Sequence, residues 1–93
     1  MQRLDVYKRQ GVHFALGLRR RGVKVAQMLE LGPGSGYFAE GMRRVFPAMK
    51  VTVMDVVQEV LDLNLRDHGY TGIRSIPEEH RPELDGRLSL IHI

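Results

Sequence analysis

Two acidic residues and a cluster of glycines have the types and the spacing to bind a polar organic cofactor. Gly32, Gly34 and Gly36 lie within five residues, just after an apolar run that contains Glu30 near its end. Glycines at this spacing indicate a sharp turn or a close approach of the backbone to a ligand. Asp55 ends a second apolar run, 21 residues after Gly34. A carboxylate there can accept hydrogen bonds from both hydroxyls of a ribose.

The loop departs from the two common phosphate-binding patterns. The dinucleotide pattern G-x-G-x-x-G requires a third glycine at the position of Tyr37, and no G-x-x-x-x-G-K-[ST] segment is present. Glu30 would repel a pyrophosphate but suits a ligand with a cationic ammonium. A fragment of an NAD-dependent oxidoreductase therefore remains only an alternative. The acid, the glycine loop and the ribose carboxylate together describe S-adenosylmethionine.

The segments “MLELGPGSGYF” and “VTVMD” resemble the first two cofactor motifs of the class I S-adenosylmethionine-dependent methyltransferases. The match covers about Lys24 to Gly69, roughly half of the chain. The resemblance implies a Rossmann-like fold and methyl transfer from S-adenosylmethionine to an unidentified acceptor. “FPAMKVTVMDVVQEV” also looks a little like the branch that methylates the oxygen of small molecules, although Val56 and Val57 replace that branch's Leu-Pro pair.

The resemblance also implies roles for individual residues. The glycines would admit the methionine part and the ribose, Glu30 would support the amino-acid end directly or through water, and Asp55 would hold the ribose. A residue after the third strand often lies near the adenine in this family, and Glu78 is the nearest match. The implied cofactor-binding residues are Glu30, Gly32, Gly34, Gly36, Asp55 and Glu78. The motifs identify no catalytic residue.

The segments around these motifs alternate between strand and helix patterns. Apolar runs of strand length cover 23–31, 50–55 and 71–76. Helical spacing of apolar residues covers 11–21, 37–46 and 56–69. In the last helix the predicted apolar face is Val57, Val60, Leu61 and Leu65. This order predicts an α/β fold, namely part of a doubly wound, Rossmann-like parallel sheet with about three strands and two to three helices.

The sequences at the two ends of the chain indicate an origin different from that of the middle. “DVYKRQ” at 5–10 and “LSLIHI” at 88–93 can be encoded by the two strands of one DNA duplex, GAT-GTG-TAT-AAG-AGA-CAG and its reverse complement. That duplex looks like the mosaic end of a transposase used to prepare sequencing libraries. We therefore expect 1–10 and 88–93 to be adapter-derived, and 11–87 to be part of a methyltransferase domain that is inactive alone.

The basic charge of the chain depends largely on these ends. Lys and Arg number 14 against 11 Asp and Glu, a formal charge of +3. Residues 1–10 hold three of the basic residues and one of the acidic residues, and 88–93 hold no Lys, Arg, Asp or Glu. Without these ends, 11 basic and 10 acidic residues remain. The run Arg19–Arg21 suits a solvated helix end before Gly22. A non-enzymatic nucleic-acid-binding fragment that uses this run is the alternative function.

Several other classes of site have no support in the sequence. Cys is absent, which excludes disulfides and thiolate metal sites. His13, His68 and His80 lack metal-ligand spacing, so we expect each to be structural or exposed. No apolar run approaches the ~20 residues of a membrane span, and the first ten residues lack the apolar core of a secretory signal. The sequence predicts a cytoplasmic protein without membrane contact, and leaves its acceptor and oligomeric state open.

Overall fold

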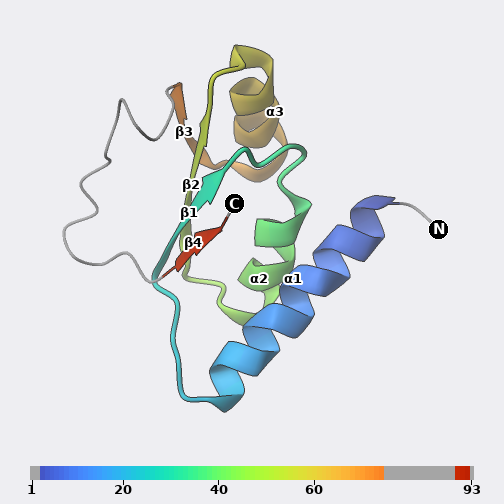
Figure 1. The fold of residues 1–93 in the computed structure, drawn as a ribbon, viewed down its shortest axis with the longest axis vertical. Helices are drawn as coiled ribbons and strands as arrows, with labels where there is room; N and C mark the ends of the chain where they lie inside the picture. Colours follow the sequence, from blue (N-terminus) through green and yellow to red (C-terminus); the bar gives the residue numbers. More distant parts are fainter. Residues whose placement is uncertain (1–2, 75–89, 93) are drawn as a thin grey trace.

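A computed structural model of the chain describes residues 3–74 and 90–92 (Figure 1). Its elements are α1 (Arg3–Arg20), β1 (Gln27–Leu31), α2 (Tyr37–Val45), β2 (Lys50–Asp55), α3 (Gln58–His68), β3 (Thr71–Arg74) and β4 (Leu90–His92). Among these described elements, no helix is long and apolar enough to span a membrane.

The strands form one parallel sheet in the order β3-β2-β1-β4. From β1 to β3 the chain steps in one direction across the sheet, and crossovers between parallel strands are right-handed. Helices α2 and α3 therefore cover the same face, and the contact between His68 and Glu40 joins them directly. The predicted α/β fold, with three parallel strands and their helices, is confirmed; β4 is an additional strand.

The core lies between the helices and this face of the sheet. It includes Met28, Val51 and Val53 from the strands and Ala15, Ala39, Met42 and Leu61 from the helices. Leu29 and Met54 are also buried but lie outside that cluster, because successive residues of a strand point to opposite faces. Burial on both faces explains why the apolar runs of β1 and β2 barely alternate.

Helices α1 and α2 cross closely at two glycines. A Cβ atom on Gly11 would overlap the carbonyl oxygen of Phe38, and a Cβ atom on Gly41 would overlap that of Lys8. Beside this crossing the rings of Phe14 and Phe38 lie 5.9 Å apart. Each glycine thus leaves room for the backbone of the opposite helix. The pair places the first half of α1 against the start of α2.

The structure differs from the predicted elements mainly at the ends. Helix α1 begins at Arg3 rather than near Gly11, because the residues set aside as adapter-derived continue the helix. Leu90–His92, also set aside, pairs in parallel with β1. These placements do not test where the residues come from, so the adapter origin stays a prediction. Residues 75–89, which include the end of the strand predicted at 71–76, lie outside the described residues.

The apolar face of α3 was predicted only in part. Leu61 is buried as expected, but Val57 is 44% exposed and Leu65 is 61% exposed. Asn64, a polar residue, is fully buried in their place. The reason is a hydrogen bond from the Asn64 side chain to the carbonyl oxygen of Gly34 in the glycine-rich loop, which apolar spacing alone does not reveal.

Candidate cofactor site

The glycine-rich loop joins the carboxyl end of β1 to the first turn of α2. The N–H of Gly32 donates to the carbonyl oxygen of Met54 at 2.9 Å, which ties the base of the loop to the end of β2. The N–H of Gly36 donates to the carbonyl oxygen of Pro33 at 3.0 Å and closes a tight turn. All three glycines of the loop, Gly32, Gly34 and Gly36, have φ between 56° and 81°, a region that other residues rarely adopt.

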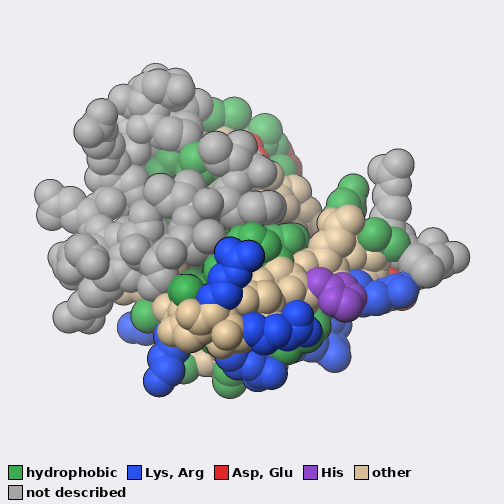
Figure 2. All heavy atoms as spheres, turned by 60° about the horizontal axis from the view of Figure 1, so that its bottom comes forward, with side chains coloured by type: hydrophobic (Ala, Val, Ile, Leu, Met, Phe, Trp, Pro, Cys, Tyr) green, Lys and Arg blue, Asp and Glu red, His purple; other side chains and the backbone are tan. Residues whose placement is uncertain are grey.

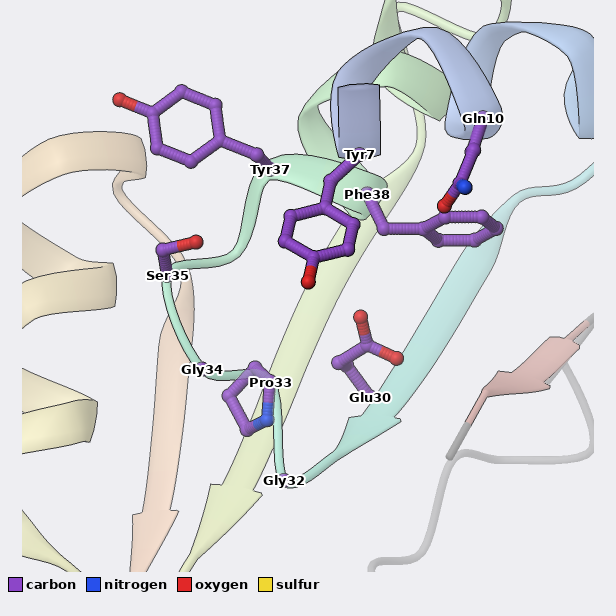
Figure 3. Close-up of a pocket in the computed structure, with 9 residues that line it drawn as sticks. All are labelled: Tyr7, Gln10, Glu30, Gly32, Pro33, Gly34, Ser35, Tyr37 and Phe38. Atoms are coloured by element: carbon purple, nitrogen blue, oxygen red, sulfur yellow. The ribbon is translucent and has the colours of Figure 1, made fainter. Parts of the chain in front are cut away.

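A cavity of about 370 Å³ lies between this loop, the end of β1 and helix α1. Its lining is Tyr7, Gln10, Glu30, Gly32, Pro33, Gly34, Ser35, Tyr37 and Phe38. Figure 3 shows the Glu30 carboxylate pointing into the space beneath the rings of Tyr7 and Phe38, whereas the ring of Tyr37 is directed away from it. Glu30 is only 3% exposed. A buried carboxylate beside a cavity favours a cationic group over an anionic one there.

The three glycines of the loop serve different geometric needs. A Cβ atom on Gly32 or on Gly34 would meet no atom within 4 Å, so both positions face open space. A Cβ atom on Gly36 would overlap Oδ1 of Asn64 and lie 2.8 Å from Cδ2 of His68. The space beside Gly36 is therefore filled by side chains of α3. Of the three glycines, only Gly32 and Gly34 leave room for a ligand beside the backbone.

Asp55 ends β2, the strand adjacent to β1. Its Oδ1 accepts a hydrogen bond at 2.9 Å from the N–H of Val57, the residue before α3. Asp55 is half-buried and lies outside the cavity lining. It directly follows Met54, whose carbonyl oxygen holds Gly32. The turn-forming role of Asp55 is thus present in the structure, and its contact with a ribose stays a prediction.

The remaining candidates do not join this site. Glu78 lies outside the described residues. Arg19–Arg21 is exposed at the end of α1 and does not line the cavity. Figure 2, which brings the bottom of Figure 1 forward, shows Lys and Arg side chains spread over this end of the molecule. His13 is exposed, and the part of the chain that the structure describes contains no group of three or more His, Cys, Asp or Glu able to hold a metal ion.

A polar cluster lies behind the loop and was not predicted from the sequence. The side chain of His68 is only 3% exposed. Its Nδ1 lies 3.1 Å from Oε2 of Glu40, and its Nε2 lies 2.7 Å from the carbonyl oxygen of Ser35. The hydroxyl of Tyr70 donates to the carbonyl oxygen of Gly36 at 3.1 Å and makes a longer contact of 3.4 Å with Oε2 of Glu40.

Aromatic stacking and a cation complete this cluster. The His68 ring stacks on Tyr70 with centroids 4.8 Å apart and meets Tyr37 edge-on at 4.9 Å. Arg43 donates to the carbonyl oxygen of His68 at 3.1 Å, and its guanidinium lies 5.4 Å from the centre of the Tyr70 ring. Burial, and then the nearby carboxylate of Glu40, raise the pKa of the Tyr70 phenol above its usual range. The phenol is therefore a neutral hydrogen-bond donor at physiological pH.

Comparisons with known proteins give structural neighbours only. No family model and no curated protein matches the chain. The plantazolicin methyltransferase BpumL, solved in complex with a pentazolic desmethylPZN analog and SAH, matches 89% of this chain with a TM-score of 0.66 and 12% identity. A putative O-methyltransferase from Nostoc punctiforme matches 74% of it with a TM-score of 0.59 and 18% identity.

These neighbours establish the fold of the chain. The match covers 33% of BpumL and 22% of the Nostoc protein, so the chain spans a third or less of either. The strands and helices described above are thus an arrangement found in methyltransferases. This agrees with the fold that the two sequence motifs implied.

Proposed function

We propose that this chain is the cofactor-binding part of a methyltransferase that transfers a methyl group from S-adenosylmethionine. The observation that carries the proposal is the placement of Glu30, the open glycines and Asp55 at the carboxyl ends of two adjacent strands. Ligands of open α/β sheets bind at that edge. The SAH in the BpumL complex supports the proposal, because S-adenosylhomocysteine is what remains after S-adenosylmethionine gives up its methyl group.

The residues present fit this cofactor. The buried carboxylate of Glu30 offers a partner to the ammonium group of the methionine part, and the space beside Gly32 and Gly34 admits a ligand against the backbone. Oδ1 of Asp55 is used by the N–H of Val57, and Oδ2 has no hydrogen bond among the described residues. That second oxygen is suited to accept hydrogen bonds from ribose hydroxyls.

The bound cofactor supplies an activated methyl group on a sulfonium sulfur, so catalysis depends largely on positioning. In this chain, Glu30 would orient the amino-acid end and Asp55 would orient the ribose. The glycine loop would fix the distance between these two ends. We extend the proposal to a small-molecule acceptor, which the resemblance of 46–60 to the O-methyltransferase branch and the putative O-methyltransferase among the neighbours support.

The test is calorimetric titration of the full-length protein that carries this sequence with S-adenosylmethionine. Asp55→Ala should weaken binding by about 1.5–3 kcal/mol, the usual size of hydrogen bonds to a charged group. Asp55→Asn should lose less of the binding free energy, because its amide oxygen can still accept a hydrogen bond from the N–H of Val57. Glu30→Gln should also lose less than Asp55→Ala if the contact to the cofactor runs through water.

Asp62→Ala is the matched control. Asp62 is an exposed residue of α3 whose Oδ1 accepts a hydrogen bond from Gln58, so the change removes the same charge from a helix rather than from the carboxyl end of a strand. It should leave the affinity unchanged. Unchanged affinity in Asp55→Ala would remove the ribose assignment. Tighter binding of a nicotinamide dinucleotide than of S-adenosylmethionine would overturn the proposed function.

A further inference from the structure

Three side chains behind the loop hold three consecutive carbonyl oxygens. Nδ2 of Asn64 donates to Gly34 at 2.8 Å, Nε2 of His68 lies 2.7 Å from the oxygen of Ser35, and the Tyr70 hydroxyl donates to Gly36 at 3.1 Å. Because a carbonyl oxygen only accepts, the Nε2 atom of His68 must carry a proton. The carbonyls at 34–36 are thus all bonded on the side of the loop where α3 lies.

The Asn64 amide is oriented by its two partners. Nδ2 also donates to the carbonyl oxygen of Val60 at 2.8 Å, and since both partners are acceptors, the nitrogen must face them. Its Oδ1 then has no hydrogen-bond partner among the described residues, although the side chain is fully buried. Leaving a buried acceptor unbonded carries a cost. This orientation of the amide holds Gly34 and leaves Oδ1 of Asn64 without a hydrogen bond among the described residues.

The two ring nitrogens of His68 make conflicting demands on a single proton. Nε2–H is required for Ser35, while Nδ1 faces a carboxylate oxygen of Glu40 at 3.1 Å. With Glu40 ionised, Nδ1 must also carry a proton to make a hydrogen bond. A neutral ring can satisfy one of these partners, and only the doubly protonated ring satisfies both. Histidine is the side chain that changes charge between about pH 5 and 8.

Besides Ser35 of the loop, the groups facing His68 come from α2 and from the residue that precedes β3. Helix α2 contributes Glu40, the ring of Tyr37 and Arg43, which donates to the His68 carbonyl oxygen. Tyr70, which precedes β3, stacks on the other side of the ring. Glu40 is the anion among them, and it is only 30% exposed. Arg43 is the cation among them.

We propose that His68 is a positioning residue for the cofactor loop, and that its grip on Ser35 is complete only when the ring is doubly protonated. The affinity for the cofactor then falls as the pH rises and the ring loses its second proton. This inference rests on the proposed function. The ordering of the loop by His68, however, can be measured without any cofactor.

The first experiment measures hydrogen exchange at 32–37 in the ligand-free, full-length protein at pH 6 and pH 8.5, corrected for the intrinsic effect of pH. Protection should be greater at pH 6 in the wild type. Glu40→Gln should be equally protected at both pH values, because the glutamine amide can donate to the unprotonated Nδ1 of a neutral ring that keeps its proton on Nε2. His68→Leu should lose protection at both. Equal protection in the wild type, His68→Leu and Glu40→Gln at each pH would overturn the positioning role.

The second experiment titrates the same proteins with S-adenosylhomocysteine at the two pH values. The wild-type dissociation constant should rise several-fold, up to about tenfold, which is the size that one hydrogen bond allows. Glu40→Gln should show no such rise and keep the affinity of the wild type at pH 6. His68→Gln, which retains an N–H donor, should recover part of the affinity that His68→Leu loses. A pH-dependent affinity that persists in His68→Leu would overturn the proposal.

The two experiments separate this inference from the proposed function. Exchange that follows the protonation of His68 without any binding of S-adenosylhomocysteine would contradict the proposed function and keep the positioning role. Binding of S-adenosylhomocysteine that is independent of pH and unaffected by His68→Leu would contradict the positioning role and keep the proposed function. Circular dichroism of each variant confirms that it is folded. Should His68→Leu not fold, the comparison of the wild type with Glu40→Gln still decides the pH dependence.

Discussion

Replacing Gly36 by alanine should be among the most damaging single-methyl additions in this chain. The residue has φ of 81°, and the new Cβ atom would overlap Oδ1 of Asn64 and lie 2.8 Å from Cδ2 of His68. The left-handed backbone costs an alanine about 1–2 kcal/mol. Moving the two side chains away would lengthen the hydrogen bonds to Gly34 and Ser35, at about 1 kcal/mol each. We expect a total loss of about 3–4 kcal/mol from the free energy of unfolding.

Gly69→Ala isolates the backbone contribution. Gly69 has φ of 74°, close to that of Gly36, and its Cβ atom would meet nothing within 4 Å. Gly69→Ala should therefore lower the free energy of unfolding by only about 1–2 kcal/mol. Urea unfolding of both full-length variants, followed by circular dichroism, measures the difference. If the two variants lost the same stability within about 0.5 kcal/mol, the usual additivity error, the packing of Asn64 and His68 on Gly36 would be refuted.

Three further predictions concern other parts of the molecule. Gly41→Ala should destabilise the protein by several kcal/mol, because its Cβ atom would overlap the carbonyl oxygen of Lys8. Gly17→Ala, at a helical position with open space, should instead stabilise the protein by about 0.5–1 kcal/mol. Thermal unfolding of the two variants tests whether the first half of α1 packs on α2. Above about pH 10 the wild type should lose stability more steeply than Tyr70→Phe. The raised pKa of Tyr70 stabilises the native state below the pKa of the unfolded phenol, and this contribution fades as the pH rises. Urea titrations of both proteins at pH 8 to 11 would contradict this if the free energy of unfolding fell with pH at the same slope in both. Gly34→Val should abolish most cofactor binding, since its β-branched side chain would fill the open space of the cavity, and calorimetry that showed wild-type affinity would refute the assignment of that space to the cofactor.

The strands and helices of the middle of the chain were predictable because their signals are local. The strand at Lys50–Asp55 was predicted with its observed bounds, and the helix predicted at 56–69 ends at Gly69, which has φ of 74°. The strand β1 is shorter than its apolar run, since only Gln27–Leu31 pairs with a neighbour. Hydrophobicity marks a segment that will be buried, whereas the pairing partner decides how much of it becomes a strand.

The site was predictable only where one short segment carries its residues. Glu30 and the glycines precede α2 in a single motif, and the structure places them around one cavity. The hydrogen bonds of the cluster behind the loop join residues 25 to 34 positions apart, so no spacing rule indicated that His68 and Tyr70 would meet Glu40 and Gly36. Asn64 was missed for a related reason. An asparagine on a helix is expected to be exposed, unless a distant backbone offers it a hydrogen bond.

The three bonded carbonyls at 34–36 have a consequence for the conformational entropy of the loop. A segment this rich in glycine would sample many backbone states if nothing restrained it, and ordering costs about 1–2 kcal/mol per residue. Asn64, His68 and Tyr70 restrain Gly34, Ser35 and Gly36 within the chain itself. The protein therefore meets this cost when it folds rather than when a ligand arrives. More of the interaction energy of an incoming ligand then remains as affinity, which is the thermodynamic meaning of a preorganised site.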